Sequence, residues 1–536
     1  MRKSLLTYLL YAVCGALCAV PYIWSKLWIF SWIAFVPVLI CEYVRENDVK
    51  HPYIKAWLRG FCFFYAYGLI LFNWFTELYP LDFAGFDPIS ALAVVLLAWL
   101  GIPLLQSLTA SFIVVMLCFF KRKNAKLIIY PLFAACLWVI NEWVHTLTWL
   151  GLPWGRLAIG QIEKLSNIQS ASIFGSYFVA FIIILTSGFL ALSIITAYKK
   201  DSIKKTVAFF CCALIIFSAN SIYGNLNLMF PSSDNGKKIT AAAIQGNFTT
   251  DEKWNEEIDN TFEIHKSLSL DAANEGAQLI VWSETALPYR INIVKWIDEY
   301  AENIAFKADA SLIIGCFESV DNDFYNITRY VSKGTGMCDK SYAKRKLVPF
   351  GEYIPLRGFI CKVLPFLDNI AMLDSDIVAG KDSSLFDTEY GKIGSLICFD
   401  SVYEKNALSS VRDGAELLCI STNDSWFGDS KALYQHNAQA ILRSIETGRY
   451  TVRAANTGIS SIITDKGEIS DMLPPLTRGY VTGEVEFISE NTLYTTVGNI
   501  WVYLSIACVV FLFALYSIKD KINGHINKQS IRRKEY

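Results

Sequence analysis

The sequence predicts two structural modules, a multi-span α-helical membrane domain of about eight helices and an α/β sandwich domain outside the lipid. The first observation is composition, because 53% hydrophobic and 14% aromatic side chains with 18% charged ones do not describe one soluble domain. The second is charge placement, since residues 1–230 and 495–518 contain nearly all the long apolar stretches. The third is the alternation of short β-rich runs with helical stretches inside residues 235–490.

Eight apolar stretches are long enough to cross a bilayer, which takes about 20 helical residues. They are residues 5–24, 27–44, 58–77, 88–119, 127–144, 168–197, 206–224 and 495–518. The first lacks a convincing small-residue cleavage site, so we expect a retained helix rather than a secretory signal. The expected regions are a membrane domain with seven helices (1–230), a soluble domain (235–490), an eighth helix (495–518) and a basic tail (519–536).

Lysine and arginine gather in every second connection between these stretches, a pattern typical of the cytoplasmic side of a membrane. The basic connections contain Arg45, Lys50, Lys55, Arg59, Lys121, Arg122, Lys123, Lys126, Lys199, Lys200, Lys204 and Lys205, and the tail contains Lys519, Lys521, Arg532, Arg533 and Lys534. With eight spans, both termini are expected in the cytoplasm. The soluble domain is then expected to face outward.

Three apolar runs of the soluble domain end in polar residues that can carry chemistry. Glu284 closes "LIVWSE", Cys398 nearly closes "GSLICF", and Asn423 and Asp424 close "LLCISTND". Open α/β folds place ligands over the ends of their strands, because the loops there form a crevice on a rigid sheet. These residues therefore form the candidate site.

Nine of the fourteen cysteines lie in the predicted membrane part, where the side chain usually serves as a small apolar group. The soluble domain contains Cys316, Cys338, Cys361, Cys398 and Cys419. Five is an odd number, so at least one thiol stays unpaired within the chain, and a disulfide between Cys338 and Cys361 is left open. Cys419 has no acid or cation motif beside it and is interpreted as a core residue.

Cys398 is the candidate nucleophile, and a cysteine attacks as its thiolate after a cation or base has assisted loss of the proton. Histidine is the usual base, and the soluble domain has His265 and His436. A papain-like pair of Cys398 with His436 is one alternative. The other is a carboxylate base with a lysine partner, the residue types that Glu284 and Lys344 supply.

Several motifs resemble the nitrilase superfamily and its glutamate, lysine and cysteine triad. These are "VWSETALP" with Glu284, "KRKLVPFGEYIP" with Lys344 and Glu352, and "GSLICFD" with Cys398. Further stretches resemble one membrane-embedded branch, the apolipoprotein N-acyltransferase family: "LGLPWGRLAIGQ", "IQGNFTTDEKW", "STNDSWFGDS" and "RAANTGIS". The resemblance covers nearly the full chain and implies a nitrilase-like α-β-β-α sandwich for the soluble domain.

The resemblance implies an enzyme of the bacterial inner membrane. Cys398 would take an acyl chain from a phospholipid as a thioester, and the α-amino group of a diacylglyceryl-cysteine lipoprotein would accept it. Glu284 would be the general base, and Lys344 would stabilise the oxyanion together with a backbone N–H near Cys398. The resemblance implies no metal, nucleotide or other cofactor, and no nucleic-acid partner. We expect a monomer.

The resemblance also selects supporting residues. The lysine of the family stands eight positions before the glutamate of "FGE", which favours Lys344 over Arg345 and Lys346. Glu352 is expected to orient the triad. Substrate contact is expected from Trp254, Trp426 and Tyr434 at the lipid crevice, and from Arg156 at a lipid phosphate.

One departure affects the turn at the nucleophile, where the family usually has cysteine, tyrosine and glutamate. Here Cys398 is followed by Phe399 and Asp400, which removes a hydroxyl group and shortens the carboxylate by one methylene.

Two other functions remain open. One is a membrane-anchored amidase or thioesterase that uses water as acceptor, and the other is a catalytically silent transporter or scaffold. The few charged residues within the predicted spans argue against transport.

Overall fold

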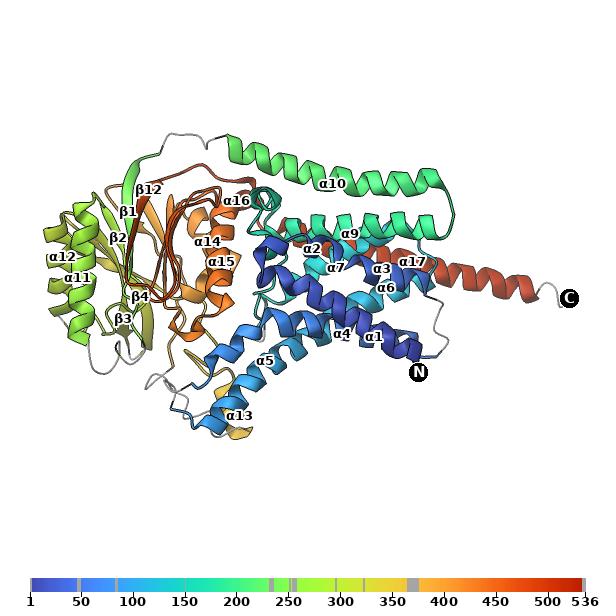
Figure 1. Ribbon diagram of the computed structural model, residues 1–536, viewed down its shortest axis with the longest axis horizontal. Coiled ribbons are helices and arrows are strands. Elements are labelled where there is room, and N and C mark those ends of the chain that lie inside the picture. Colours follow the sequence, from blue (N-terminus) through green and yellow to red (C-terminus); the bar gives the residue numbers. More distant parts are fainter. Residues whose placement is uncertain are drawn as a thin grey trace. The chain divides into compact units, whose positions relative to one another are not determined.

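Figure 1 shows the chain as a computed structural model, which describes residues 2–45, 50–81, 85–149, 151–230, 236–249, 252, 258–294, 296–321, 323–363 and 376–532. The chain forms two compact units. The membrane unit contains Met1–Asn73, Trp99–Leu226 and Asn499–Tyr536, and the α/β unit contains Trp74–Ala98 and Asn227–Gly498. Trp74–Ala98 thus packs with the α/β unit, although we had expected it within the membrane domain over residues 1–230.

The membrane unit is built from helices. They are α1 (Arg2–Ala19), α2 (Phe30–Ile33), α3 (Val36–Val44), α4 (Pro52–Leu71), α5 (Pro88–Ala110, which begins in the α/β unit), α6 (Phe112–Arg122), α7 (Ile129–Val144), α8 (Ala171–Phe174), α9 (Ser176–Tyr198), α10 (Ile203–Met229) and α17 (Ile500–Arg532). Among the described residues, seven segments are long and apolar enough to span a membrane. The remaining predicted stretch, 127–144, forms the shorter apolar helix α7. The predicted multi-span helical domain is therefore confirmed.

Two span boundaries differ from the predicted ones for local reasons. α4 begins at Pro52, because proline fits the first turn of a helix, where its missing N–H group needs no partner. Arg59, which we had counted in a basic connection, therefore lies inside α4. It is 2% exposed and forms an ion pair with Glu42. Likewise α9 begins at Ser176, because Gly175 at φ 77° interrupts the apolar run predicted over 168–197.

The α/β unit contains two six-stranded sheets. The first has the order β12-β1-β2-β3-β4-β5, with β1 (Lys238–Gln245), β2 (Leu279–Val281), β3 (Ser311–Val320), β4 (Asp323–Ser332), β5 (Gly336–Ala343) and β12 (Gly479–Glu486). The second has the order β11-β10-β9-β8-β7-β6, with β6 (Phe386–Asp387), β7 (Lys392–Ile397), β8 (Leu417–Thr422), β9 (Thr451–Ala455), β10 (Ser460–Ile463) and β11 (Ile469–Leu473).

Helices cover the outer face of each sheet, which gives the four layers of an α-β-β-α sandwich (Figure 1). The first sheet is covered by α11 (Ile258–Asn274) and α12 (Trp296–Ala308), and the second by α14 (Glu404–Arg412) and α15 (Lys431–Thr447). Two shorter helices, α13 (Arg357–Val363) and α16 (Leu493–Val497), belong to the same unit. The predicted sandwich is therefore confirmed.

The period of two along each strand explains both apolar interfaces. In β1, Ala241 and Ala243 pack between the two sheets against residues such as Val452 and Leu417. Their neighbour Ala242 points the other way, into the core between the first sheet and its helices. Successive side chains of a strand face opposite sides, so a continuous apolar run fits a sheet that is covered on both faces.

Candidate active site

Parallel pairing brings the ends of the chemically relevant strands together within each sheet. β2 is parallel to β1 and β3, and β7 and β9 are both parallel to β8. Glu284 follows β2, Cys398 follows β7, and Asn423 and Asp424 follow β8. The sandwich then brings the two sheets' strand ends together, because the backbone N–H of Asn423 donates a hydrogen bond to Glu284 Oε2 at 2.9 Å.

Glu284 is one of three charged side chains that hydrogen bonds join in the candidate site. Its exposed fraction is 5%. Besides the bond from Asn423, its Oε1 atom accepts hydrogen bonds from Lys344 Nζ at 2.9 Å and from Asn326 Nδ2 at 2.8 Å. Donors on both oxygens fix the direction in which the carboxylate points.

Lys344 lies between two carboxylates and is 2% exposed. Its Nζ atom donates to Glu284 Oε1 and to Glu352 Oε1, each at 2.9 Å. Burial alone would lower the pKa of Lys344, but Glu284 and Glu352 raise it well above its usual value. The side chain therefore stays a charged ammonium group in the site.

Glu352 is held as firmly as Glu284. Its Oε2 atom accepts from the backbone N–H of Val348 at 2.8 Å, and Asn326 Nδ2 lies 3.3 Å from its Oε1 atom. Burial raises the pKa of Glu352, Lys344 opposes that rise, and Glu284 adds to it. Asn326 bridges both carboxylates and is a site residue that our sequence reasoning missed. The available signal was a polar side chain inside the buried strand β4.

Cys398 lies where β7 ends and the short 3-10 helix η9 (Cys398–Val402) begins. It has φ +47°, a left-handed backbone conformation that non-glycine residues rarely adopt, and it is 9% exposed. Burial raises the pKa of the Cys398 thiol, Glu284 adds to the rise, and Lys344 opposes it. The thiol is therefore protonated at neutral pH, and it would need a base to take its proton in order to act as a nucleophile.

Asp400 connects the turn at Cys398 to the segment that carries Lys344. Its side chain is 0% exposed, and its oxygens accept hydrogen bonds from Tyr342 Oη and the backbone N–H of Lys346, both at 2.7 Å. Burial raises the pKa of Asp400, and the hydrogen bond from Tyr342 opposes that rise. Asp400 therefore has hydrogen-bond donors within reach, although its side chain is one methylene shorter than the glutamate that the resembled family usually has here.

Phe399 fills an apolar position beside the turn. It is 7% exposed, and its ring meets Tyr403 edge-on with 5.3 Å between the ring centroids. An aromatic ring without a hydroxyl group suits this packed contact. The two departures from the resembled family are therefore both packed into the fold around Cys398.

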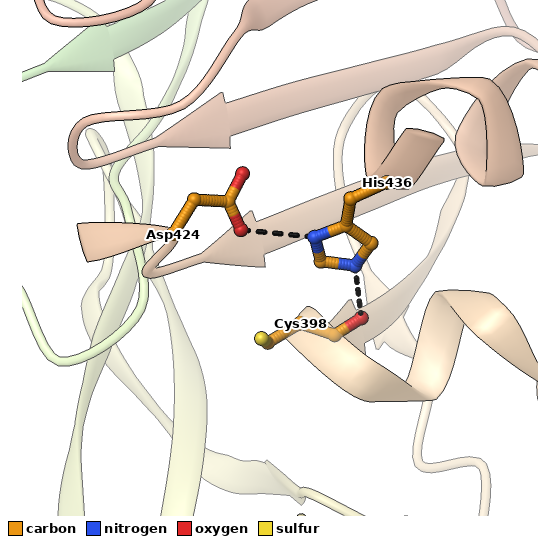
Figure 2. A group of neighbouring side chains, drawn as sticks. All are labelled: Cys398, Asp424 and His436. Atoms are coloured by element: carbon orange, nitrogen blue, oxygen red, sulfur yellow. Dashed lines mark hydrogen bonds and ion pairs between the residues drawn. The ribbon is translucent and has the colours of Figure 1, made fainter. Parts of the chain in front are cut away.

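A second polar network includes Cys398, Asp424 and His436 (Figure 2). His436 Nδ1 is 2.9 Å from Asp424 Oδ1, and His436 Nε2 is 3.2 Å from the carbonyl oxygen of Cys398. Asp424 also accepts from Arg453 Nη2 at 2.8 Å and from Thr422 Oγ1 at 2.8 Å. Burial alone would raise the pKa of Asp424, but Arg453 and His436 hold it well below its usual range.

This network includes three residue types that bind metals. Ligand atoms of Cys398, Asp424 and His436 all lie within 4.8 Å of one another. However, both carboxylate oxygens of Asp424 already accept hydrogen bonds, and the neighbouring Arg453 guanidinium repels a cation. We therefore interpret the group as a hydrogen-bond network. Arg453 was missed from the sequence, although a charged residue inside the fully buried strand β9 is unusual.

The residues expected to contact substrate are found in different places. Trp426 lies in the short 3-10 helix η10 (Ser425–Phe427) directly after Asp424, and Tyr434 on α15 is 50% exposed. Arg156 belongs to the membrane unit, is 1% exposed and donates to Ser176 Oγ at 3.0 Å. Trp254 lies outside the described residues. Substrate contact by these four residues stays a prediction.

Two cysteine interpretations are also settled by the fold. Cys419 lies on β8, is 0% exposed and packs in the core between the sheets, as expected. Cys338 is a free thiol, so the disulfide with Cys361 that the sequence left open is not formed. The papain-like alternative is not favoured, because His436 Nε2 faces the carbonyl oxygen of Cys398.

Comparison with known proteins finds two family models in the chain. A model described as apolipoprotein N-acyltransferase N-terminal domain matches residues 14–189, and a carbon-nitrogen hydrolase model matches residues 240–489. A relative named apolipoprotein N-acyltransferase from Geobacter metallireducens is 29% identical over 519 residues, which cover 95% of either chain. One of the same name from Gloeobacter violaceus is 28% identical, over 92% of this chain and 90% of its own. These alignments extend over both units of the structure.

Proposed function

The chain belongs to the apolipoprotein N-acyltransferase family, and on that premise we propose that it transfers an acyl chain from a membrane phospholipid to a diacylglyceryl-cysteine lipoprotein. The observation that supports this most is the hydrogen-bonded cluster of Glu284, Lys344 and Glu352, in which Lys344 Nζ lies 2.9 Å from both carboxylates and Glu284 and Lys344 act on the pKa of the Cys398 thiol. The acyl group would travel as a thioester on Cys398. The product is the lipoprotein with an amide-linked third acyl chain.

In the first half-reaction, the sulfur of Cys398 attacks an ester carbonyl of the phospholipid. Glu284 takes the thiol proton, a C–S bond forms, and Lys344 stabilises the negative oxygen of the tetrahedral intermediate. The intermediate collapses by breaking the C–O bond, and the proton held by Glu284 goes to the departing alkoxide. The products are a lysophospholipid and the thioester.

In the second half-reaction, the α-amino group of the lipoprotein attacks the thioester. A C–N bond forms, Glu284 removes a proton from the amine, and the C–S bond breaks to restore the Cys398 thiol. Both steps pass through an oxyanion at the same carbonyl carbon. One base and one cation therefore serve both halves of a ping-pong reaction.

The membrane unit supports a lipid substrate. Seven apolar helices long enough to span a bilayer occur among the described residues, and an enzyme with two lipid-anchored substrates benefits from a site at the bilayer surface. The basic connections favour cytoplasmic termini and an outward α/β unit in a bacterial inner membrane. We propose this orientation together with the reaction.

The proposed function is tested with purified protein and a phospholipid that carries a labelled acyl chain. We expect a hydroxylamine-sensitive label on Cys398 that passes to the amino group of a diacylglyceryl peptide when the peptide is added. If the label leaves only as free fatty acid, the protein is a hydrolase that uses the same site residues with water as the acceptor. A folded protein that takes up no label contradicts the proposal.

Replacing Lys344 by methionine is expected to slow thioester formation by about 10³-fold, because removal of one oxyanion-stabilising donor costs about 10²–10³. The substitution also removes the cation that lowers the pKa of Cys398, which adds to the loss. The measurement is the single-turnover rate of labelling with excess phospholipid. Stability also falls, because Glu284 and Glu352 lose the cation between them.

Two further variants separate these effects. Lys346→Met removes a neighbouring cation whose Nζ lies 4.4 Å from the Tyr403 ring centroid, and we expect it to keep the normal labelling rate. Adding Glu352→Gln to Lys344→Met removes one of the two uncompensated carboxylates, so it should recover melting temperature without recovering activity. Equal loss of labelling in Lys346→Met would contradict the assignment of Lys344.

A further inference from the structure

The backbone at Cys398 is held in a conformation that needs support. A non-glycine residue at φ +47° is unfavourable, and it persists only where neighbouring groups fix it. The carbonyl oxygen of Cys398 receives two side-chain contacts, from Ser401 Oγ at 2.8 Å and from His436 Nε2 at 3.2 Å. Both contacts hold the peptide group that follows the nucleophile.

His436 is itself fixed from several elements. It lies on α15 and is 1% exposed. Asp424, after β8, faces its Nδ1 atom, and Arg453 on β9 lies 3.3 Å from the same nitrogen. Ser401 of η9 lies 3.2 Å from Nε2, and the Phe427 ring meets the imidazole edge-on at 6.0 Å between centroids. Because each ring nitrogen has a partner, the imidazole is fixed in one orientation.

The partners of the two nitrogens indicate where the protons lie. Nδ1 faces a carboxylate oxygen of Asp424 and Nε2 faces the carbonyl oxygen of Cys398, and neither oxygen can donate. A proton on each nitrogen therefore satisfies both contacts. A neutral ring with its only proton on Nδ1 would keep the bond to Asp424 and lose the bond to the carbonyl, so the contact with Cys398 calls for Nε2–H. A nitrogen that donates to this carbonyl is not free to take a proton from the thiol.

We propose that His436 is a positioning residue that holds Cys398 in its left-handed conformation by donating Nε2–H to its carbonyl oxygen, with Asp424 and Arg453 orienting the ring. In the proposed acyl transfer, which this inference builds on, the turn then presents the Cys398 sulfur to Glu284 and Lys344. Donation to the carbonyl also polarises the peptide N–H of Phe399 beside the reacting sulfur. His436 thus acts through Cys398 and takes no proton from substrate.

The test compares two substitutions of His436. Glutamine keeps an N–H donor at a similar reach but cannot act as a base, whereas leucine fills the space without a donor. We expect His436→Gln to acylate Cys398 within about threefold of the normal rate, since the hydrogen bond is retained. His436→Leu is expected to lose about 10–100-fold, because small displacements of a reacting group cost rate on this scale.

Acylation is measured as the burst of p-nitrophenolate that is released when the butyryl group of p-nitrophenyl butyrate is transferred to the sulfur of Cys398. This small ester needs no phospholipid site. An enzyme that reacts with it but not with phospholipid disproves the proposed function, while the comparison of variants still decides the role of His436. The same burst is recorded from pH 6 to pH 9, because a donor role predicts profiles of the same shape in the native enzyme and His436→Gln.

Controls separate positioning from general destabilisation. His265→Leu alters the other histidine of the α/β unit, which is also 1% exposed, and should keep its burst rate even if the melting temperature falls. Ser401→Ala removes the second donor to the same carbonyl and should slow the burst. A full burst in His436→Leu overturns the proposal. So does an equally large loss in a folded His436→Gln, which decides the matter even where the leucine variant does not fold.

Discussion

Cys398→Ala is expected to abolish labelling by phospholipid and all transfer to peptide, a loss of at least about 10⁴-fold. Alanine has no atom that can form the thioester. It retains a Cβ, so the backbone at φ +47° is as accessible to alanine as to cysteine. The protein should therefore remain folded in detergent with a melting temperature within a few degrees of the native value.

The chain offers a matched control in Cys419→Ala. Cys419 is a buried cysteine on the parallel neighbour strand β8, so the same atom is removed from the same core. This variant should keep its labelling and show a comparable change in stability. A hydroxylamine-sensitive label that persists in Cys398→Ala, or that disappears in Cys419→Ala, would show that another cysteine carries the acyl chain.

The two-module architecture was predictable because each module has its own hydrophobic pattern. Apolar runs of about 20 residues predict membrane helices, and runs of four to eight residues predict strands that are buried on both faces. The boundaries were less predictable, since they depend on single residues such as Pro52 and Gly175. Nothing in the pattern of Trp74–Ala98 indicated that it would pack with the α/β unit.

The site was predictable to the extent that its residues lie in motifs at strand ends. Glu284 and Lys344 follow β2 and β5, Glu352 belongs to the same motif as Lys344, and direct hydrogen bonds join the three. Asn326 and Arg453 lie inside strands instead, where a sequence shows only a polar residue among apolar ones. Their importance comes from contacts with residues far away in the chain, which only the folded structure supplies.

Glu284→Gln is the other substitution with a large expected effect, and the size of that effect depends on pH. Glutamine fits the same space and still accepts from Lys344, but it cannot take the thiol proton. We expect thioester formation at pH 7 to fall by about 10²–10⁴-fold, the usual contribution of a general base. Without the base, reaction depends on thiolate formed in equilibrium with water. The pKa of Cys398 is raised, so the thiolate fraction is small at pH 7 and grows about tenfold per pH unit.

The single-turnover rate of Glu284→Gln should therefore rise with a slope of about one on a plot of log rate against pH, and its deficit should shrink as the pH increases. The native enzyme should respond less, because Glu284 removes the proton during attack. Glu318→Gln is the control, since Glu318 pairs with Arg329 and Ser341 outside the cluster and should leave the native profile unchanged. Parallel profiles for Glu284→Gln and the native enzyme would mean that Glu284 supports the charge of Lys344 and that another group removes the thiol proton.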